Sequence, residues 1–226
     1  MRIQAVFEKN ERVRHIGHLD IQRAVQRGLR RSGLPVAYSN GFNPHILVSF
    51  ASALSTGACG RREIMDVTMA EEVEPALFLE KMNGAMPPEM RLLEARRVED
   101  RHPALTALLK AASYDLTLRD PGQAEKLIAA VDAMMGQDRI LAVRKSKSGL
   151  KECDIKPLIY ALRGKGSHLY ATLALTERET CKPGMLLDAM KNAAGIPPEE
   201  EVRMLVIRTA LLGEDGEGRL APLESL

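Results

Sequence analysis

Four arginines in the first third of the chain have the clearest potential for chemistry. They are Arg23, Arg27, Arg30 and Arg31, and on a helix separations of three and four residues place them in one stripe. Like charges so spaced repel by about 0.2–0.5 kcal/mol per pair, and no carboxylate occurs from Ile21 to Arg62 to relieve this. Because a guanidinium forms paired hydrogen bonds with phosphate or carboxylate, the stripe indicates an anion-binding site. The alternative is a solvated helix face.

Two histidines stand just before this stripe. His15 and His18 have a spacing that could bind a metal, but no third ligand is near in sequence, so we expect no metal site. His18 can instead form hydrogen bonds, contact a ligand or act as a general acid or base. Asp20 would lie in the first helical turn, where a negative charge is favourable.

A polar loop follows the stripe and supplies further candidate ligand contacts. The candidates are Tyr38, Ser39, Gly41, Phe42 and Asn43. Gly41 permits a positive φ, and Pro44 restrains the residue before it to extended conformations. The loop is either a binding loop or an ordered turn, and its last residue, His45, is a second catalytic candidate.

We expect His18, Asp20, Arg23 and the Tyr38–Pro44 loop to converge in one pocket. The helix would be about 20 Å long, at ~1.5 Å per residue. A returning strand of about seven residues would span about 23 Å, so its end would come back beside His18. The helix N-terminus and the loop amides would then complete an anion site.

Charge is unevenly distributed along the chain. Residues 1–62 hold ten basic and three acidic residues, a net charge of +7, whereas the whole chain has +2. This asymmetry favours an anionic partner for the N-terminal part. Lys9 and Arg14 join the stripe as candidate contacts. Glu63 and Asp66, the next acids, could pair with some of the arginines.

Composition excludes several classes of protein. No apolar run approaches ~20 residues and the N-terminus has no apolar segment of a secretory signal, so we expect a cytoplasmic protein that does not enter a membrane. Cys59, Cys153 and Cys181 are too scattered for a disulfide framework or for the usual cluster and zinc motifs. Trp is absent and aromatic residues make up 4% of the chain, which favours phosphate or shape recognition over stacking.

The hydrophobic pattern predicts the order β-α-β-β-α-β twice, which is an α+β fold of two tandem ferredoxin-like domains. The first half has strands at 2–9, 62–69 and 90–98, extended segments at 36–39 and 45–51 around a turn, and helices at 19–31 and 74–83. The second has strands at 114–119, 168–176 and 202–212, extended segments at 139–145 and 155–162 with a turn at 147–149 between them, and helices at 123–135 and 184–194. We therefore expect domains at 1–100 and 112–212, a linker at 101–111 and a mobile acidic tail at 213–226.

The residues of these motifs resemble the radical-SAM-associated family, a domain of unknown function fused to or encoded beside B12-binding radical SAM proteins. The resemblance rests on Phe7-x-Lys9, Arg14-x-x-Gly17-His18-Leu19-Asp20-x-x-Arg23, Arg27-x-x-Arg30-Arg31, Leu34-Pro35, Tyr38-Ser39-x-Gly41-Phe42-Asn43-Pro44, Leu54-x-x-Gly57, Glu63-x-x-Asp66 and Asp154-Ile155-Lys156-Pro157. Gly17 stands where the family pattern has serine, and Lys156 where it has arginine.

The resemblance implies an accessory to a radical SAM protein, with the iron–sulfur cluster, SAM and cobalamin in that partner and no cofactor in this chain. Together with the stripe, it favours a module that binds structured RNA for the partner to modify. One alternative is a metal-independent endoribonuclease that uses His18 or His45. Another is a surface for an acidic protein or a small anion.

Overall fold

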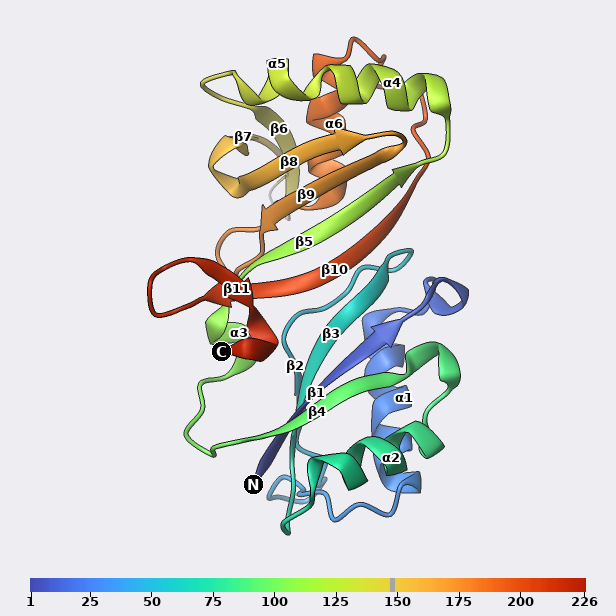
Figure 1. Ribbon diagram of the computed structural model, residues 1–226, viewed down its shortest axis with the longest axis vertical. Helices are drawn as coiled ribbons and strands as arrows, with labels where there is room; N and C mark the ends of the chain where they lie inside the picture. Colours follow the sequence, from blue (N-terminus) through green and yellow to red (C-terminus); the bar gives the residue numbers. More distant parts are fainter. Residues whose placement is uncertain (147–148) are drawn as a thin grey trace. The chain divides into compact units, whose positions relative to one another are not determined.

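The structure, a computed structural model, describes residues 1–146 and 149–226 of a mixed α/β protein (Figure 1). The chain forms two compact units. Unit 1 comprises Met1–Leu109 and Arg208–Leu226, and unit 2 comprises Lys110–Ile207. The second boundary falls inside a strand, β10 (Met204–Glu214).

Unit 1 follows the predicted order of strands and helices. Its elements are β1 (Arg2–Lys9), η1 (Glu11–Val13), α1 (His18–Arg31), β2 (Val48–Phe50), β3 (Cys59–Thr68), α2 (Pro75–Ala85), η2 (Pro88–Met90), β4 (Leu92–Val98), α3 (Leu105–Leu108), β11 (Leu220–Pro222) and η4 (Leu223–Ser225). In its sheet β4 pairs with β1, β1 with β3 and β3 with β2, and each of these pairs is antiparallel. The two predicted helices are confirmed, and α2 has the expected proline in its first turn.

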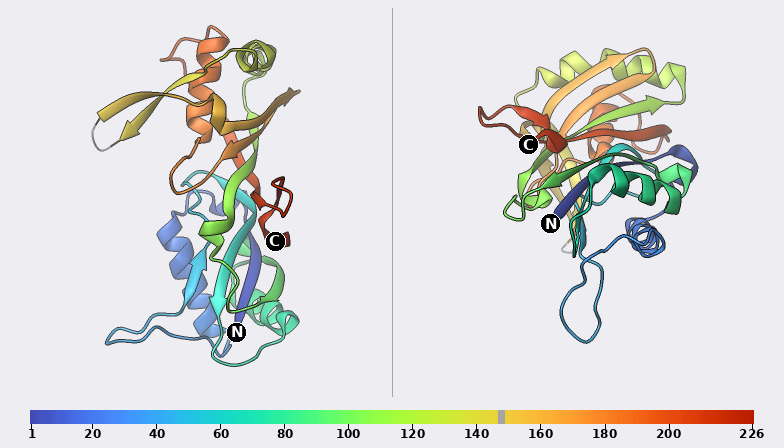
Figure 2. Two further views of the ribbon diagram at one scale, coloured as in Figure 1. Left: turned by 90° about the vertical axis from the view of Figure 1, so that its left-hand side faces the viewer. Right: turned by 60° about the horizontal axis from the view of Figure 1, so that its bottom comes forward.

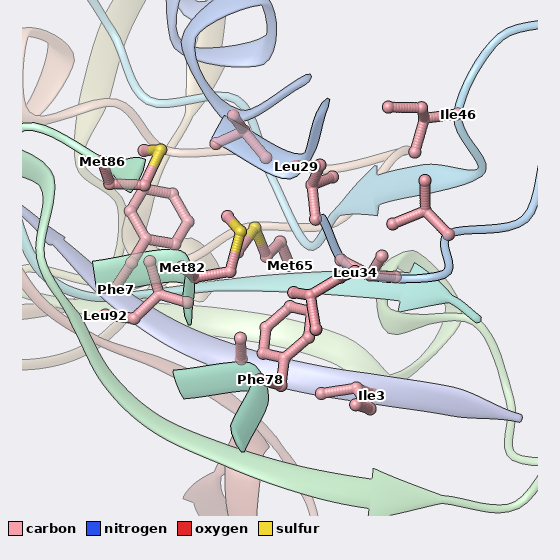
Figure 3. Close-up of a cluster of buried hydrophobic side chains, with 14 of the residues drawn as sticks. Ile3, Phe7, Leu29, Leu34, Ile46, Met65, Phe78, Met82, Met86 and Leu92 are labelled. Carbon is pink, nitrogen blue, oxygen red and sulfur yellow. The ribbon is translucent and has the colours of Figure 1, made fainter. Parts of the chain in front are cut away.

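The two helices pack on one face of this sheet, because their buried side chains share one core with β1 and β3 (Figure 3). Leu29 of α1 and Phe78 and Met82 of α2 contribute to it. Gly28 lets α1 approach the end of α2 closely, since a Cβ at this position would lie 2.6 Å from the sulfur of Met86. The opposite side of α1 is therefore the one left for solvent.

The segment between α1 and β3 differs from its prediction. Residues 36–39 form no strand: Val36 and Tyr38 make single bridges, to Met69 and Ile46. Of the extended segment predicted at 45–51, only β2 (Val48–Phe50) forms a strand. Asn40 to Pro44 project as a loop instead of continuing the sheet (Figure 2).

Unit 2 differs more from its prediction, which was a repeat of the β-α-β-β-α-β order of the first half. Its elements are β5 (Leu109–Leu118, whose first residue lies in unit 1), α4 (Pro121–Ala129), α5 (Val131–Met135), β6 (Leu141–Ser146), β7 (Gly149–Asp154), η3 (Lys156–Leu158), β8 (Ile159–Lys165), β9 (His168–Ala174) and α6 (Pro183–Ala193). The predicted helix at 123–135 is broken at Ala130, and β6 and β7 form a hairpin of their own. In the other sheet β9 lies between β5 and β8. The turn predicted at Lys147 and Ser148 lies outside the described residues.

The segment for which we predicted a mobile tail is part of unit 1. It forms β11 and η4, and Leu223 is fully buried. Arg62 binds Glu224 at 2.6 Å, and Arg96 donates a hydrogen bond to a backbone oxygen of Leu226. Of the helices in the described residues, none is long and apolar enough to cross a membrane.

Candidate functional site

The arginine face of α1, defined as Arg23, Arg27, Arg30 and Arg31, is exposed to solvent at all four positions. Helix α1 is amphipathic, and Ile21, Val25 and Leu29 bury its other side in the core. The helical spacing in the sequence thus predicted this surface correctly. It holds four positive charges along about two turns of helix.

The four arginines of this face differ in their partners. Arg23 donates to the Asp20 carboxylate at 3.0 Å, and Arg31 donates to the carbonyl of Ala85 at 2.5 Å. Arg27 and Arg30 have no hydrogen-bond or ion-pair partner among the residues that the structure describes. The two arginines without such a partner therefore lie in the middle of the face.

Most other basic residues of the N-terminal part are neutralised within the fold. The ion pairs are Arg2–Asp66, Arg12–Glu89, Arg14–Glu11, Arg62–Glu94 and Arg62–Glu224. Several of these acids come from later in the sequence, so the net charge of +7 on residues 1–62 overstates the positive field. Glu63 and Asp66 do not pair with the arginine face, because they bind Arg208 and Arg2.

Lys9, a predicted anion contact, is fully buried and has a structural role. Its ammonium donates to the carbonyls of Arg14 at 2.7 Å and Ala58 at 3.0 Å, which ties together the two loops beside the start of α1. Burial lowers the pKa of Lys9. No ligand can reach an ammonium so enclosed. Arg14, one-third exposed, is held by Glu11 at 2.9 Å.

A second buried cation fixes the neighbourhood of His18. Arg208 makes a two-pronged salt bridge with Glu63, at 2.8 Å and 2.5 Å, and both side chains are at most 5% exposed. The same guanidinium donates to the carbonyl of Ala53 at 3.3 Å. Through Ala53, Arg208 therefore fixes the position of the segment that follows Phe50.

His18 is half-buried at the start of α1, with its ring edge-on to Phe50 at a centroid distance of 5.4 Å. Burial lowers the pKa of His18, and the nearby positive charge of Arg208 lowers it further, while Glu63 opposes both. The imidazole is therefore neutral at neutral pH. Asp20, beside it, is exposed and bound to Arg23.

The loop after α1 is a closed hairpin. Ser39 donates its N–H to the carbonyl of His45 at 2.9 Å, and its hydroxyl lies 2.8 Å from Nδ1 of His45. Gly41 has φ of 120°, and Phe42 is completely exposed. Tyr38 is 47% exposed. The loop presents aromatic side chains and fixes His45 at its base.

The structure does not bring this loop to His18. Phe50, which touches His18, pairs with Met65 of β3. The bridge from Val36 reaches Met69, just past the end of β3, four residues farther along the chain and about 13 Å away at ~3.3 Å per residue. The loop then projects beyond that point, near the C-terminal end of α1 (Figure 2). The expected pocket depended on a strand running back along the helix, and the chain forms only single bridges there.

His18 and His45 consequently lie at opposite ends of α1 and cannot act as an acid–base pair. Among the described residues, no three side chains of His, Cys, Asp or Glu are grouped so as to hold a metal ion. Cys59 and Cys181 are buried, and burial raises the pKa of Cys181 to about 11. Neither thiol is an activated nucleophile.

The sequence analysis missed one polar cluster in unit 2. Asp115 on β5 lies 2.8 Å from Nδ1 of His168 on β9, and Tyr170 stacks on the histidine ring. A weak signal was present, because Asp115 is the one carboxylate in β5 and lies between the apolar residues Tyr114 and Leu116. Its partner is 53 residues away and could not be assigned from spacing.

Fold and surface together define a mixed α/β protein with an exposed arginine helix and no metal cluster among its described residues. The chain belongs to the DUF2344 family, described as an uncharacterized protein conserved in bacteria, which it matches over residues 2–183. No curated protein matches the chain.

Proposed function

We propose that this protein is a non-catalytic binding module that holds structured RNA on the arginine face of α1 for a radical SAM partner. In this proposal the partner carries the iron–sulfur cluster, SAM and cobalamin, and both proteins work in the cytoplasm. The radical SAM association rests on the sequence resemblance. The RNA ligand rests on the charge and geometry of α1.

The observation that carries the proposal is that Arg27 and Arg30, at the centre of an exposed face, are unpaired within the described part of the chain. Several other arginines of unit 1 have carboxylate or carbonyl partners, as Arg62 does with Glu94 and Glu224. Arg61, Lys81, Arg91 and Arg101 are exposed without a side-chain partner among the described residues, but they are not aligned on one helix face as Arg27 and Arg30 are. Exposed arginines that repel each other and lack partners favour an external anion. RNA phosphates, spaced along a backbone, suit a row of guanidinium groups.

We further propose that each unit is a ferredoxin-like fold. In unit 1 the strand order β4-β1-β3-β2 and the sequence β1-α1-β2-β3-α2-β4 support this assignment. In unit 2 it requires the β6–β7 hairpin to be an insertion and α4 and α5 to be one broken helix. Such folds leave one sheet face open, which suits a binding module.

The test is a double reversal, Arg27→Glu with Arg30→Glu, followed by titration with a structured RNA hairpin over a range of salt concentrations. We expect weaker binding and a salt slope smaller by about two, one for each arginine that no longer binds a phosphate. The control, Arg139→Glu with Arg203→Glu, changes net charge equally but lies on exposed residues of unit 2. An equal reduction in affinity in both double variants would contradict a specific role for α1.

A further inference from the structure

The sheet of unit 2 has one face covered by helices and one face with polar and aromatic side chains. Gly164 on β8 faces the helices, because a Cβ there would lie 2.6 Å from Ile128 of α4. Its partner Leu169 and the alternate residues Ala171 and Leu173 are buried on that same side. The residues between them, on the opposite face, are therefore those not used by the core.

The opposite face is organised around an oriented histidine. The carboxylate of Asp115 lies 2.8 Å from Nδ1 of His168, and the hydroxyl of Thr117 lies 3.4 Å from the same ring nitrogen. The Asp115 side chain is 10% exposed and that of His168 is 38% exposed. The buried carboxylate fixes the ring through Nδ1, so Nε2 remains without a partner among the described residues.

Tyr170 extends this group into a set of stacked planar side chains. Its ring is within 9° of parallel to that of His168, with centroids 5.8 Å apart. The guanidinium of Arg163, its cross-strand partner, lies over the ring at 4.6 Å from the centroid. Lys165 pairs with His168 in the register, and both Arg163 and Lys165 are exposed.

The charges on this face favour an anion. Neither Arg163 nor Lys165 has an ion-pair partner among the residues that the structure describes, and the carboxylate of Asp115 is buried and directed at His168. Planar rings beside unpaired cations suit a nucleotide, whose base can stack while its phosphate binds the cations.

We propose that this face of unit 2, centred on Tyr170 and His168, binds a nucleotide of single-stranded RNA. The base takes the place of the Arg163 guanidinium on the ring of Tyr170, and Arg163 and Lys165 then hold the adjoining phosphates. Open sheet faces of four-stranded α/β domains bind unpaired bases in this way. The ligand class is that of the proposed function, but the residues differ from those of α1, so either surface can fail alone.

The test uses the absence of tryptophan from the chain. Tyr170→Trp provides a single indole, whose fluorescence should be quenched to saturation by an oligouridylate of about ten nucleotides. Tyr170→Ala should weaken binding of that oligonucleotide at least about ten-fold, as expected when one base stack is removed. Its affinity for duplex RNA should stay within about two-fold of the wild type, and Tyr170→Phe, which keeps the ring, should retain most of the affinity.

Tyr160→Ala is the matched control, since Tyr160 is a 52% exposed tyrosine on β8 that neither stacks on another ring nor lies under a cation among the described residues. It should leave binding unchanged. The proposal is overturned if Tyr170→Ala, shown folded by thermal melting, weakens single-strand binding no more than Tyr160→Ala. If Tyr170→Ala has no such effect but duplex binding still depends on Arg27 and Arg30, the proposed function remains intact. Absence of any RNA binding by the wild type would overturn both proposals.

Discussion

Unit 1 uses its positive charges in two opposite ways. Lys9 and Arg208 are buried and fully engaged, and they tie together segments beside the start of α1. Arg27 and Arg30 are exposed and have no hydrogen-bond or ion-pair partner among the described residues. Charge counted along a sequence does not separate these classes, because burial and partners decide which cations stabilise the protein and which remain for a ligand.

The largest expected effect concerns the buried salt bridge. Glu63→Gln leaves the Arg208 guanidinium buried without its counter-charge, so the free energy of unfolding should fall by about 3–5 kcal/mol. Chemical denaturation measures it. Glu72→Gln, which breaks the exposed pair with Arg97, should change stability by less than about 1 kcal/mol. Similar decreases in the two variants would erase the distinction between the buried and exposed cations.

A smaller decrease in stability is expected for Lys9→Met. The variant keeps the volume of the side chain but removes the donor to the carbonyls of Arg14 and Ala58. Because the carbonyl of Arg14 also accepts from Gly57, mainly that of Ala58 is left unsatisfied, at a cost of about 1–3 kcal/mol. Lys81→Met, on the exposed side of α2, is the control. If Lys9→Met is as stable as this control, the hydrogen bonds from Lys9 are not needed to keep the two loops in place.

Neutralising Arg27 and Arg30, the exposed arginines without partners, should not lower the free energy of unfolding. Arg27→Ala with Arg30→Ala relieves repulsion along α1 and should leave the free energy of unfolding unchanged or higher by about 0.2–0.5 kcal/mol at low salt. The gain should shrink as salt is added, since exposed charges are screened. Marked destabilisation would show that these arginines serve the fold and would remove the basis for an anion site on α1.

The smallest effect is the pH dependence contributed by His18. Its pKa in the folded protein lies below the ordinary value of 6.5, mainly because of burial. As pH falls through 6.5 the unfolded chain takes up the proton first, so the folded state loses stability over that interval. Denaturation midpoints for His18→Gln should show a smaller decrease at acid pH, whereas His45→Gln, at an exposed position, should follow the wild type. Superimposable curves for all three proteins would contradict the contribution of His18.

Periodic features were predictable and long-range placements were not. The 3.6-residue pattern gave α1, its buried side and its exposed arginines, because all three follow from local spacing. The position of the Tyr38–Asn43 loop depended on whether residues 36–39 would pair along β3, and a strand pattern does not determine register. The roles of Lys9 and Asp115 depended on partners many residues away.

The salt bridge between Glu63 and Arg208 joins residues 145 positions apart in the chain, with all of unit 2 between them. During synthesis at roughly 5–20 residues per second, Glu63 emerges about 7–30 s before its partner. The Glu63 carboxylate therefore lacks its Arg208 partner while unit 2 is made. The order of assembly follows: unit 2 can fold as it appears, and unit 1 becomes complete only when the chain returns to it.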